Sequence, residues 1–260
     1  MSRRATDKAH VEFDRVRMAF GEREVFHALS CQFPRGTISV ILGGSGSGKS
    51  TILRLIGGLV RPQGGSIRVD GEDLTRRSET ALYAVRKKLG MLFQGGALLD
   101  SLTVFDNLAF PLREHTALTE REIADAVHES LGAVGLSDVD ALLPGQLSGG
   151  MVKRVALARA LIMKPVILLC DEPFSGLDPV SVMRIEALLA RINRTLGVTM
   201  LVVSHHIAST MRLAAWVLLL LPDGAVEGTP GTLRASADSR VTTFLSEEPG
   251  PAHAALEATC

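Results

Sequence analysis

A glycine-rich stretch, GGSGSGKST at residues 43–51, carries the residue types needed to bind a polyphosphate. Small residues let the backbone curl so that successive N–H groups point inward, and such a nest attracts anions. The stretch follows the apolar run GTISVIL and precedes KSTILRLIGGL, whose apolar residues have helical spacing. This strand–loop–helix context predicts a nucleoside triphosphate site of the Walker A type.

Within this loop, Lys49 supplies a positive charge for the β- and γ-phosphates, and the Ser50 hydroxyl is placed to bind Mg²⁺. The helix that begins near Lys49 adds its positive end. A glycine-rich turn that happens to precede a lysine is the alternative, and a chain of this length would match the pattern by chance on the order of one time in a hundred. The predicted ATP-binding residues of the loop are Gly43, Gly44, Ser45, Gly46, Ser47, Gly48, Lys49, Ser50 and Thr51.

An acidic pair ends the apolar run VILLCDEP. Asp171 and Glu172 are adjacent at the end of a predicted strand, so their side chains point to opposite faces and cannot share one role. Asp171 suits a contact to Mg²⁺, directly or through a ligand of the metal, and Glu172 suits polarising an attacking water. A solvated strand end without a function is the alternative.

A hydroxyl and two glycines open a second predicted helix in LSGGMVKR, at Ser148, Gly149 and Gly150. A helix N-terminus of this kind can bind an anion. Ser-Gly-Gly alone is a common turn. Upstream of an acidic pair, in a chain that already has a phosphate loop, the Ser-Gly-Gly motif is a highly specific signal.

Together these motifs make the chain similar to the nucleotide-binding subunits of the ABC family. The resemblance covers roughly residues 11–245. It implies an α/β P-loop NTPase fold with an antiparallel β subdomain and a helical subdomain inserted at about residues 97–163. It also implies that Phe20 stacks on adenine, Gln94 is the Q-loop glutamine, Ser148-Gly149-Gly150 is the signature, Asp178 ends the D-loop, and His205 is the switch histidine.

The resemblance further implies ATP and Mg²⁺ as cofactors and a head-to-tail homodimer. Each ATP would lie between the Walker A loop of one copy and the signature of the other, because a γ-phosphate needs donors on several sides. In the implied reaction Lys49 holds the phosphates, Glu172 is the general base, and His205 holds the γ-phosphate and the attacking water. Gln94 would contact Mg²⁺ and link the site to an integral membrane permease.

Two positions depart from the family pattern. Met151 stands where the signature usually ends in Gln, and Met offers no strong hydrogen bond. His206 replaces the acidic residue usual after the switch histidine, and it points away from His205 if the strand continues. The other histidines show no ligand spacing and are expected at the surface or in caps: His10, His27, His115, His128 and His253.

The segment FQGGALLDSLTVFDNLAFPLREHT, followed by LSGGM, resembles the ATPases of the Mce/Mla group of bacterial lipid transport systems. Those ATPases drive phospholipid movement between membranes together with a permease and an Mce-domain lipid-binding protein. The resemblance places the chain on the cytoplasmic face of the bacterial inner membrane, held there by the permease. An apolar docking patch is expected from Phe105, Leu108, Phe110 and Leu112, with Arg113 and Glu114 at its rim; packing within the helical subdomain is the alternative.

Composition limits other functions. Lys+Arg and Asp+Glu both number 28 among 260 residues, and this lack of a basic excess argues against a nucleic-acid partner. The longest apolar run, LAAWVLLLL, is short of the roughly 20 residues that span a bilayer. Three scattered cysteines indicate a reducing compartment without a disulfide framework or a zinc site.

Two other functions stay open: an ABC ATPase of another importer or exporter, such as one for amino acids, and a non-transport ABC ATPase acting on nucleic acid or ribosomes. The second is disfavoured because the chain has neither a second cassette nor a long coiled-coil insertion. Residues 236–260 are rich in Pro, Ala and Glu and predict a loosely held stretch. Within it, residues 246–260 form the expected C-terminal tail beyond the domain, which could contact a second copy.

Overall fold

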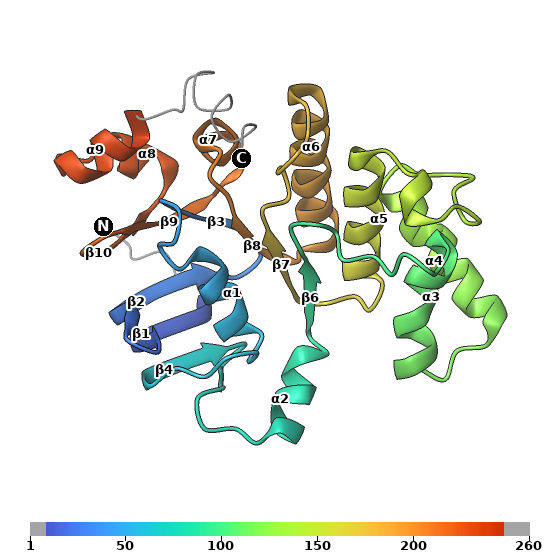
Figure 1. Cartoon of the computed structure of the whole chain (residues 1–260), viewed down its shortest axis with the longest axis horizontal. Coiled ribbons are helices and arrows are strands. Elements are labelled where there is room, and N and C mark those ends of the chain that lie inside the picture. Colours follow the sequence, from blue (N-terminus) through green and yellow to red (C-terminus); the bar gives the residue numbers. More distant parts are fainter. Residues whose placement is uncertain (1–8, 247–260) are drawn as a thin grey trace, which may run out of the picture.

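Two β-sheets and a group of helices make up residues 9–246, the part of the chain that the computed structural model describes (Figure 1). The first sheet is antiparallel and has the strand order β2-β1-β4-β5. Its long hairpin turns at Gly21 and Glu22. The strands of this sheet are β1 (Ala9–Phe20), β2 (Arg23–Pro34), β4 (Gly64–Val69) and β5 (Glu72–Asp73).

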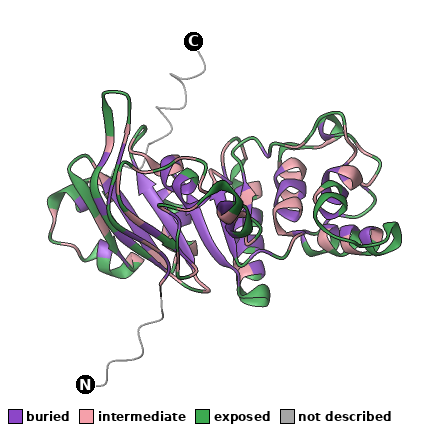
Figure 2. Ribbon diagram, turned by 90° about the horizontal axis from the view of Figure 1, so that it is seen from below, coloured by how far each residue is buried: buried purple, intermediate pink, exposed green. Residues whose placement is uncertain are grey.

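The second sheet has the order β10-β9-β3-β8-β7-β6, with all pairs parallel except the β10 edge. Its parallel strands are apolar because both faces are covered. In β3, Val40 and Leu42 join one core cluster while Ile41 joins the other, and Figure 2 shows the buried centre of this sheet. The strands are β3 (Ile38–Gly43), β6 (Leu89–Leu92), β7 (Ile167–Asp171), β8 (Thr199–Val203), β9 (Trp216–Leu221) and β10 (Gly224–Gly228).

Helices cover the parallel sheet, and α3, α4 and α5 pack together away from the first sheet (Figure 1). This arrangement confirms the expected α/β fold with an antiparallel β subdomain and a helical insertion. Within residues 9–246, no helix combines the length and apolar character needed to cross a membrane. The helices are α1 (Lys49–Ile56), α2 (Glu79–Arg86), α3 (Val104–His115), α4 (Glu120–Ala133), the 3₁₀ turn η1 (Pro144–Gln146), α5 (Gly149–Leu161), α6 (Pro179–Leu196), α7 (Ile207–Leu213), α8 (Pro230–Arg234) and α9 (Ser239–Ser246).

A capping box forms the start of α4. Thr119 Oγ1 accepts from the Glu122 backbone N–H, and the Glu122 carboxylate accepts from the Thr119 backbone N–H. Arg113 on α3 binds Asp106 at 3.0 Å and Glu120 at 2.7 Å, so it also joins the two helices.

Only part of the expected apolar docking patch is exposed. Leu108 and Leu112 are 0% and 4% exposed because α3 turns them into the core that it shares with α4 and α5. Phe105 is half-buried against the same core, whereas Phe110 is 50% exposed. The patch prediction is therefore wrong for Leu108 and Leu112.

The C-terminal part of the described chain is also more ordered than its composition predicts. Residues Ser239–Ser246 form α9, where Val241 is fully buried and Phe244 and Leu245 pack against the main core. The prediction of a loosely held stretch is wrong for this helix, because three apolar side chains at helical spacing suffice to hold it. Apart from Ser246, the predicted tail at 246–260 lies outside the described residues.

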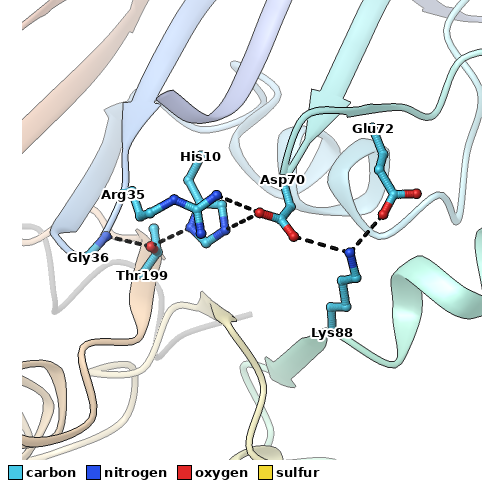
Figure 3. A network of polar contacts seen from close by, with 7 residues as sticks. All are labelled: His10, Arg35, Gly36, Asp70, Glu72, Lys88 and Thr199. Atoms are coloured by element: carbon cyan, nitrogen blue, oxygen red, sulfur yellow. Dashed lines mark hydrogen bonds and ion pairs between the residues drawn. The ribbon is translucent and has the colours of Figure 1, made fainter. Parts of the chain in front are cut away.

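A buried histidine joins the two sheets at the edge where the parallel strands begin (Figure 3). His10 on β1 is only 2% exposed; its Nδ1 lies 2.6 Å from Thr199 Oγ1 and its Nε2 lies 3.4 Å from Asp70 Oδ1. The expectation of a surface or capping histidine is therefore wrong for His10. Burial and the charge of Arg35 lower the pKa of His10, whereas Asp70 raises it. His253 lies outside the described residues.

Asp70 is the centre of this network. It accepts from Arg35 Nη2 at 2.5 Å and from Lys88 Nζ at 3.1 Å, and Lys88 also binds Glu72 at 2.7 Å (Figure 3). The hydrogen bonds from Arg35 and from Lys88 lower the pKa of Asp70 to about 2, against the opposing effect of burial. The network thus connects the first sheet to the starts of β6 and β8.

We expect Asp70→Asn to lower the free energy of unfolding at pH 7 by about 1–2 kcal/mol, because Arg35 and Lys88 lose their carboxylate partner. The pKa of Asp70 is lower in the folded chain than its ordinary value of 3.8. Its stabilising contribution is therefore complete above that value and is lost as the pH falls from about 4 to about 2. Chemical denaturation at pH 7 and at decreasing pH should show the difference between wild type and variant shrinking towards the acidic end.

Asp14→Asn is the matched control, because Asp14 is 62% exposed and its ion-pair partner, Arg15, is its exposed neighbour. This control should change stability little. An Asp70→Asn variant as stable as Asp14→Asn at pH 7 would show that the network does not stabilise the fold.

Candidate nucleotide-binding and catalytic site

The glycine loop (residues 43–51) connects β3 to α1, as the sequence predicts. Two positions require glycine. Gly48 has a φ of 97°, and an added Cβ would lie 2.6 Å from side-chain atoms of Val25 and Phe26. At Gly43, with φ 154°, an added Cβ would lie 2.9 Å from the Leu220 carbonyl oxygen. The loop can therefore hold this shape only with bare backbone at both points.

The loop and α1 present positive charge together. No side chain caps the first turn of α1 and no acidic residue lies in it, so its N–H groups and dipole are available to an anion. Lys49 Nζ donates to the carbonyl oxygens of Gly43 at 2.8 Å and Gly44 at 2.9 Å, which holds the ammonium over the loop. Burial lowers the pKa of Lys49, whereas the charges of Glu172 and Asp171 raise it.

The Ser50 hydroxyl and the Asp171 carboxylate lie next to each other, as expected for two oxygen ligands of one cation. Ser50 Oγ donates to Asp171 Oδ1 at 3.0 Å. Burial raises the pKa of Asp171, the Ser50 hydrogen bond lowers it, and the charge of Glu172 raises it. A divalent cation would compensate this half-buried carboxylate, so the residues fit Mg²⁺.

Protein side chains alone would not complete such a metal site. Across residues 9–246, no group of three His, Cys, Asp or Glu side chains could hold a metal ion. Mg²⁺ usually takes one or two protein ligands and completes its octahedron with water and phosphate oxygens. The donor set therefore suits a cation that arrives with a polyphosphate.

Glu172 and Asp171 have different partners, as their adjacent positions predict. Glu172 has a left-handed φ of 47° and its backbone N–H donates to the Val203 carbonyl oxygen at 3.0 Å. Its Oε2 lies 2.9 Å from Nδ1 of His205. The Glu172 side chain is 13% exposed and that of His205 is 55% exposed. The pair can therefore bind a water at its exposed side.

His206 does not point away from His205. The ring centroids of the two histidines are 4.5 Å apart, and His206 also packs edge-on against Phe174 at 6.2 Å. The prediction is wrong because β8 ends at Val203, so the alternation of a strand no longer applies. Burial and the charge of His205 lower the pKa of His206, while Glu172 raises it.

The β1–β2 hairpin lies against the glycine loop. Phe20 ends β1, pairs with Arg23, and is 46% exposed. Arg23 Nη2 donates to the Gly46 carbonyl oxygen at 3.0 Å. The hairpin that contains Phe20 is thus attached to the loop, and the stacking of its exposed ring on adenine remains a prediction. Arg23 was not identified from the sequence. Its only signal in the sequence is a basic residue directly after the hairpin turn.

Gln94 follows β6 and lies beside the segment that follows Glu172. Its Nε2 lies 3.4 Å from Ser175 Oγ. Its carbonyl oxygen accepts a hydrogen bond from Lys153 on α5. The structure therefore brings the predicted Q-loop glutamine next to the acidic pair, and its contact to Mg²⁺ remains a prediction.

Sequence reasoning missed three polar residues that hold the segment after Gln94. Asn107 on α3 is 1% exposed and its side chain bonds both backbone groups of Leu99. Arg159 on α5 donates to the Gly96 carbonyl oxygen at 3.0 Å, and Lys153 binds Gln94. The sequence signals only that each is a polar residue among apolar neighbours of a helix, and the backbone groups that it binds belong to another segment.

The signature residues begin α5. Ser148 Oγ accepts from the Met151 backbone N–H at 3.3 Å, and Ser148 and Gly149 are exposed. The apolar side chains of α5 and of α1 belong to different core clusters. Figure 1 shows the two helices apart, with the parallel sheet between them. Within one chain, the structure does not bring Ser148 to the glycine loop.

Asp178, the predicted last residue of the D-loop, caps α6. Its carboxylate accepts from the backbone N–H groups of Val180 and Ser181, each at 3.0 Å, and these bonds lower its pKa together with the Ser181 hydroxyl. Ser181 Oγ would be 3.7 Å from a Cβ added at Gly150. The D-loop and the signature thus form one exposed face.

The chain is similar to known proteins in sequence and in fold. The family model described as ABC transporter matches residues 26–175. The chain is 44% identical over 243 residues to the intermembrane phospholipid transport system ATP-binding protein MlaF of Haemophilus influenzae, covering 93% of this chain and 92% of that protein. It is 46% identical over 197 residues to the probable ribonucleotide transport ATP-binding protein mkl of Mycobacterium tuberculosis, covering 76% of this chain and 55% of that protein.

Among solved structures, the fold is similar to a dimer of the ATP-binding cassette MJ0796 in a post-hydrolysis state bound to ADP and Pi. The alignment has a TM-score of 0.77 and 30% sequence identity, and it covers 85% of this chain and 98% of that chain.

We expect Gly48→Ala to weaken binding of Mg²⁺-ATP at least tenfold, because its Cβ would collide with Val25 and Phe26 and shift the loop. Gly132→Ala, at an exposed position on α4, is the control, since its added Cβ would have no neighbour within 4 Å. Equilibrium binding of a fluorescent ATP analogue measures the difference, and circular dichroism checks that both variants fold. Equal affinity for the two variants would contradict the steric role of Gly48.

Proposed function

This chain belongs to the ABC transporter family, and from that premise we propose that it is the ATP-hydrolysing subunit of a bacterial system that moves phospholipid between the inner and outer membranes. The observation that carries the ATPase assignment is the pairing, beside one glycine loop, of Ser50 with Asp171 and of His205 with Glu172. The likeness to MlaF over nearly the whole of both chains supports the cargo.

We assign ATP binding to the hairpin and the glycine loop. Phe20 would stack on the adenine, while the loop N–H groups and Lys49 would bind the β- and γ-phosphates. Ser50 and Asp171 would hold Mg²⁺, with Gln94 as a further ligand. When bound, Mg²⁺ neutralises charge on the phosphates.

Glu172 is the proposed general base. A water held by Glu172 and His205 would attack the γ-phosphorus, and its proton would pass to the Glu172 carboxylate. A bond forms between the water oxygen and phosphorus while the bond from phosphorus to the β–γ bridging oxygen breaks, leaving ADP and phosphate. His205 is placed to orient Glu172 and to contact the γ-phosphate.

Two copies would complete each site. The exposed Ser148 and Gly149 of one copy, with the half-buried Gly150, would bind the γ-phosphate held by the loop of the other, and Asp178 would lie at the contact between them. This arrangement surrounds a highly charged group with donors from two sides. The dimer of the similar cassette MJ0796 is consistent with it.

An integral membrane permease is the proposed membrane partner, together with an Mce-domain lipid-binding protein. Exposed apolar side chains occur after Gln94, on α3 and on α2: Leu99 at 46%, Phe110 at 50% and Tyr83 at 46%. These would replace the docking patch that the sequence predicted. The subunit would then lie on the cytoplasmic face of the inner membrane, held there by the permease.

An ABC ATPase for another cargo is the second candidate. The protein mkl is named for ribonucleotide transport, but this chain spans only 55% of it. An importer or exporter of amino acids would need the same ATP chemistry. A non-transport role on nucleic acid is disfavoured because acidic and basic residues balance at 28 each.

We expect Glu172→Gln to lower the rate of ATP hydrolysis at least 100-fold, since the amide cannot accept the water proton. The affinity for Mg²⁺-ATP should change less than threefold, and ATP should hold the variant as a dimer in size-exclusion chromatography. The control is Glu129→Gln, an exposed position on α4, which should keep wild-type activity. Hydrolysis by Glu172→Gln near the wild-type rate would exclude Glu172 as the base.

The cargo is tested on the complex purified with its membrane partners. We expect mass spectrometry to identify co-purified phospholipid, and we expect ATP-dependent transfer of a fluorescent phospholipid between liposomes. Stimulation of ATP hydrolysis by ribonucleotides or amino acids, without lipid transfer, would instead support the second candidate.

A further inference from the structure

Lys153 on α5 is a buried cation whose partners are main-chain oxygens. It is 7% exposed; its Nζ donates to the carbonyl oxygen of Gln94 and lies 3.5 Å from that of Glu172. Among the ion pairs of residues 9–246, none includes Lys153. Burying an ammonium without a carboxylate partner is costly. What Lys153 contributes to the structure is therefore its contact with these two carbonyl oxygens.

The same face of α5 binds the rest of the segment that follows β6. Arg159 donates to the Gly96 carbonyl oxygen at 3.0 Å and to Asn107 Oδ1 at 3.4 Å. Asn107 in turn donates to the Leu99 carbonyl oxygen at 3.1 Å. Residues 94–99, which we call the Gln94 segment, are thus attached to α5 at one end and to the α3–α5 pair at the other.

One rigid helix therefore carries two kinds of contact. Its first turn presents Ser148 at the surface, and its next turn holds the backbones of Gln94 and Glu172. At a rise of about 1.5 Å per residue, Ser148 and Lys153 are separated by roughly 8 Å along the helix. Any displacement of the helix start must shift the Lys153 ammonium, because a helix of this length moves as a unit.

We propose that Lys153 is a positioning residue that couples the two ATP sites of a dimer. The inference rests on the proposed function, in which Ser148 of one copy contacts the nucleotide of the other. When that contact forms, α5 moves and Lys153 carries the Gln94 and Glu172 backbones of its own chain with it. The state of one site is thereby transmitted to the general base of the second.

The chemistry of the side chain fits this role. A lysine ammonium has three donors on a flexible stem, so it can bind carbonyl oxygens of two separate segments at once. Burial lowers the pKa of Lys153, while the nearby charges of Glu172 and Asp171 raise it. The acidic pair that belongs to the site therefore also favours the charged form that donates both bonds.

The test compares Lys153→Met with its parent in full chains that also carry Glu172→Gln, so that ATP is bound but not consumed. Met keeps the length of the side chain and removes every donor, and replacing a buried charge by an apolar group should leave the fold stable. Amide hydrogen exchange is measured with and without Mg²⁺-ATP. We expect ATP to protect residues 43–51 in both proteins, but to protect residues 94–99 at least fivefold less in Lys153→Met.

Two further variants separate positioning from folding. Lys153→Arg keeps the donors and should restore the protection of residues 94–99. Arg154→Met, whose guanidinium donates to the Gly135 carbonyl oxygen, should behave like the parent. If Lys153→Met does not fold, Lys153→Gln, a smaller neutral side chain, takes its place.

The outcomes distinguish this inference from the proposed function. If ATP binds, the dimer forms and residues 94–99 are protected equally with and without Lys153, the coupling role is wrong and the ATPase assignment stands. The same conclusion follows if ATP protects residues 94–99 as little in a folded Lys153→Arg variant as in Lys153→Met. If the parent protein neither binds ATP nor dimerises in its presence, the proposed function itself fails.

Discussion

The parallel alignment of β3, β8 and β7 brings three chain segments to one edge of the sheet, and the whole candidate site depends on it. Val203 lies in register with both Ile41 and Asp171. The glycine loop after β3, the acidic pair at the end of β7 and the histidines after β8 therefore leave the sheet side by side. Backbone hydrogen bonds from Glu172 to Val203 and from Ser204 to Ile41 extend this alignment past the strands. Ser50 can reach Asp171 because β3, which precedes the glycine loop, and β7, which ends at Asp171, end at the same edge of the sheet.

Local signals were sufficient to predict much of the fold and the site. The glycine loop, the acidic pair and the start of α5 each combine small or charged residues with a change of apolar periodicity, and the capping box at Thr119 is read from four residues. Each of these features is determined by neighbours in sequence. Their steric and hydrogen-bonding requirements are met within one loop or one helical turn, so the pattern alone carries the information.

The errors and omissions concern contacts between distant segments. His10 is buried because Thr199 and Asp70 provide partners from other strands, and no spacing rule contains that information. Lys153 was missed for the same reason, since its acceptors follow β6 and β7. Leu108 and Phe110 are both apolar residues of α3, and only the packing of α4 and α5 decides which of them is buried. Periodicity predicts a helix and leaves its orientation undetermined.

The network around Asp70 helps to join the two sheets into one rigid unit. It ties the antiparallel sheet to the beginnings of β6 and β8, while Arg23 ties the same sheet to the glycine loop at the other end of the parallel strands. With connections at both ends, the two sheets resist rotation against each other and act as a single frame.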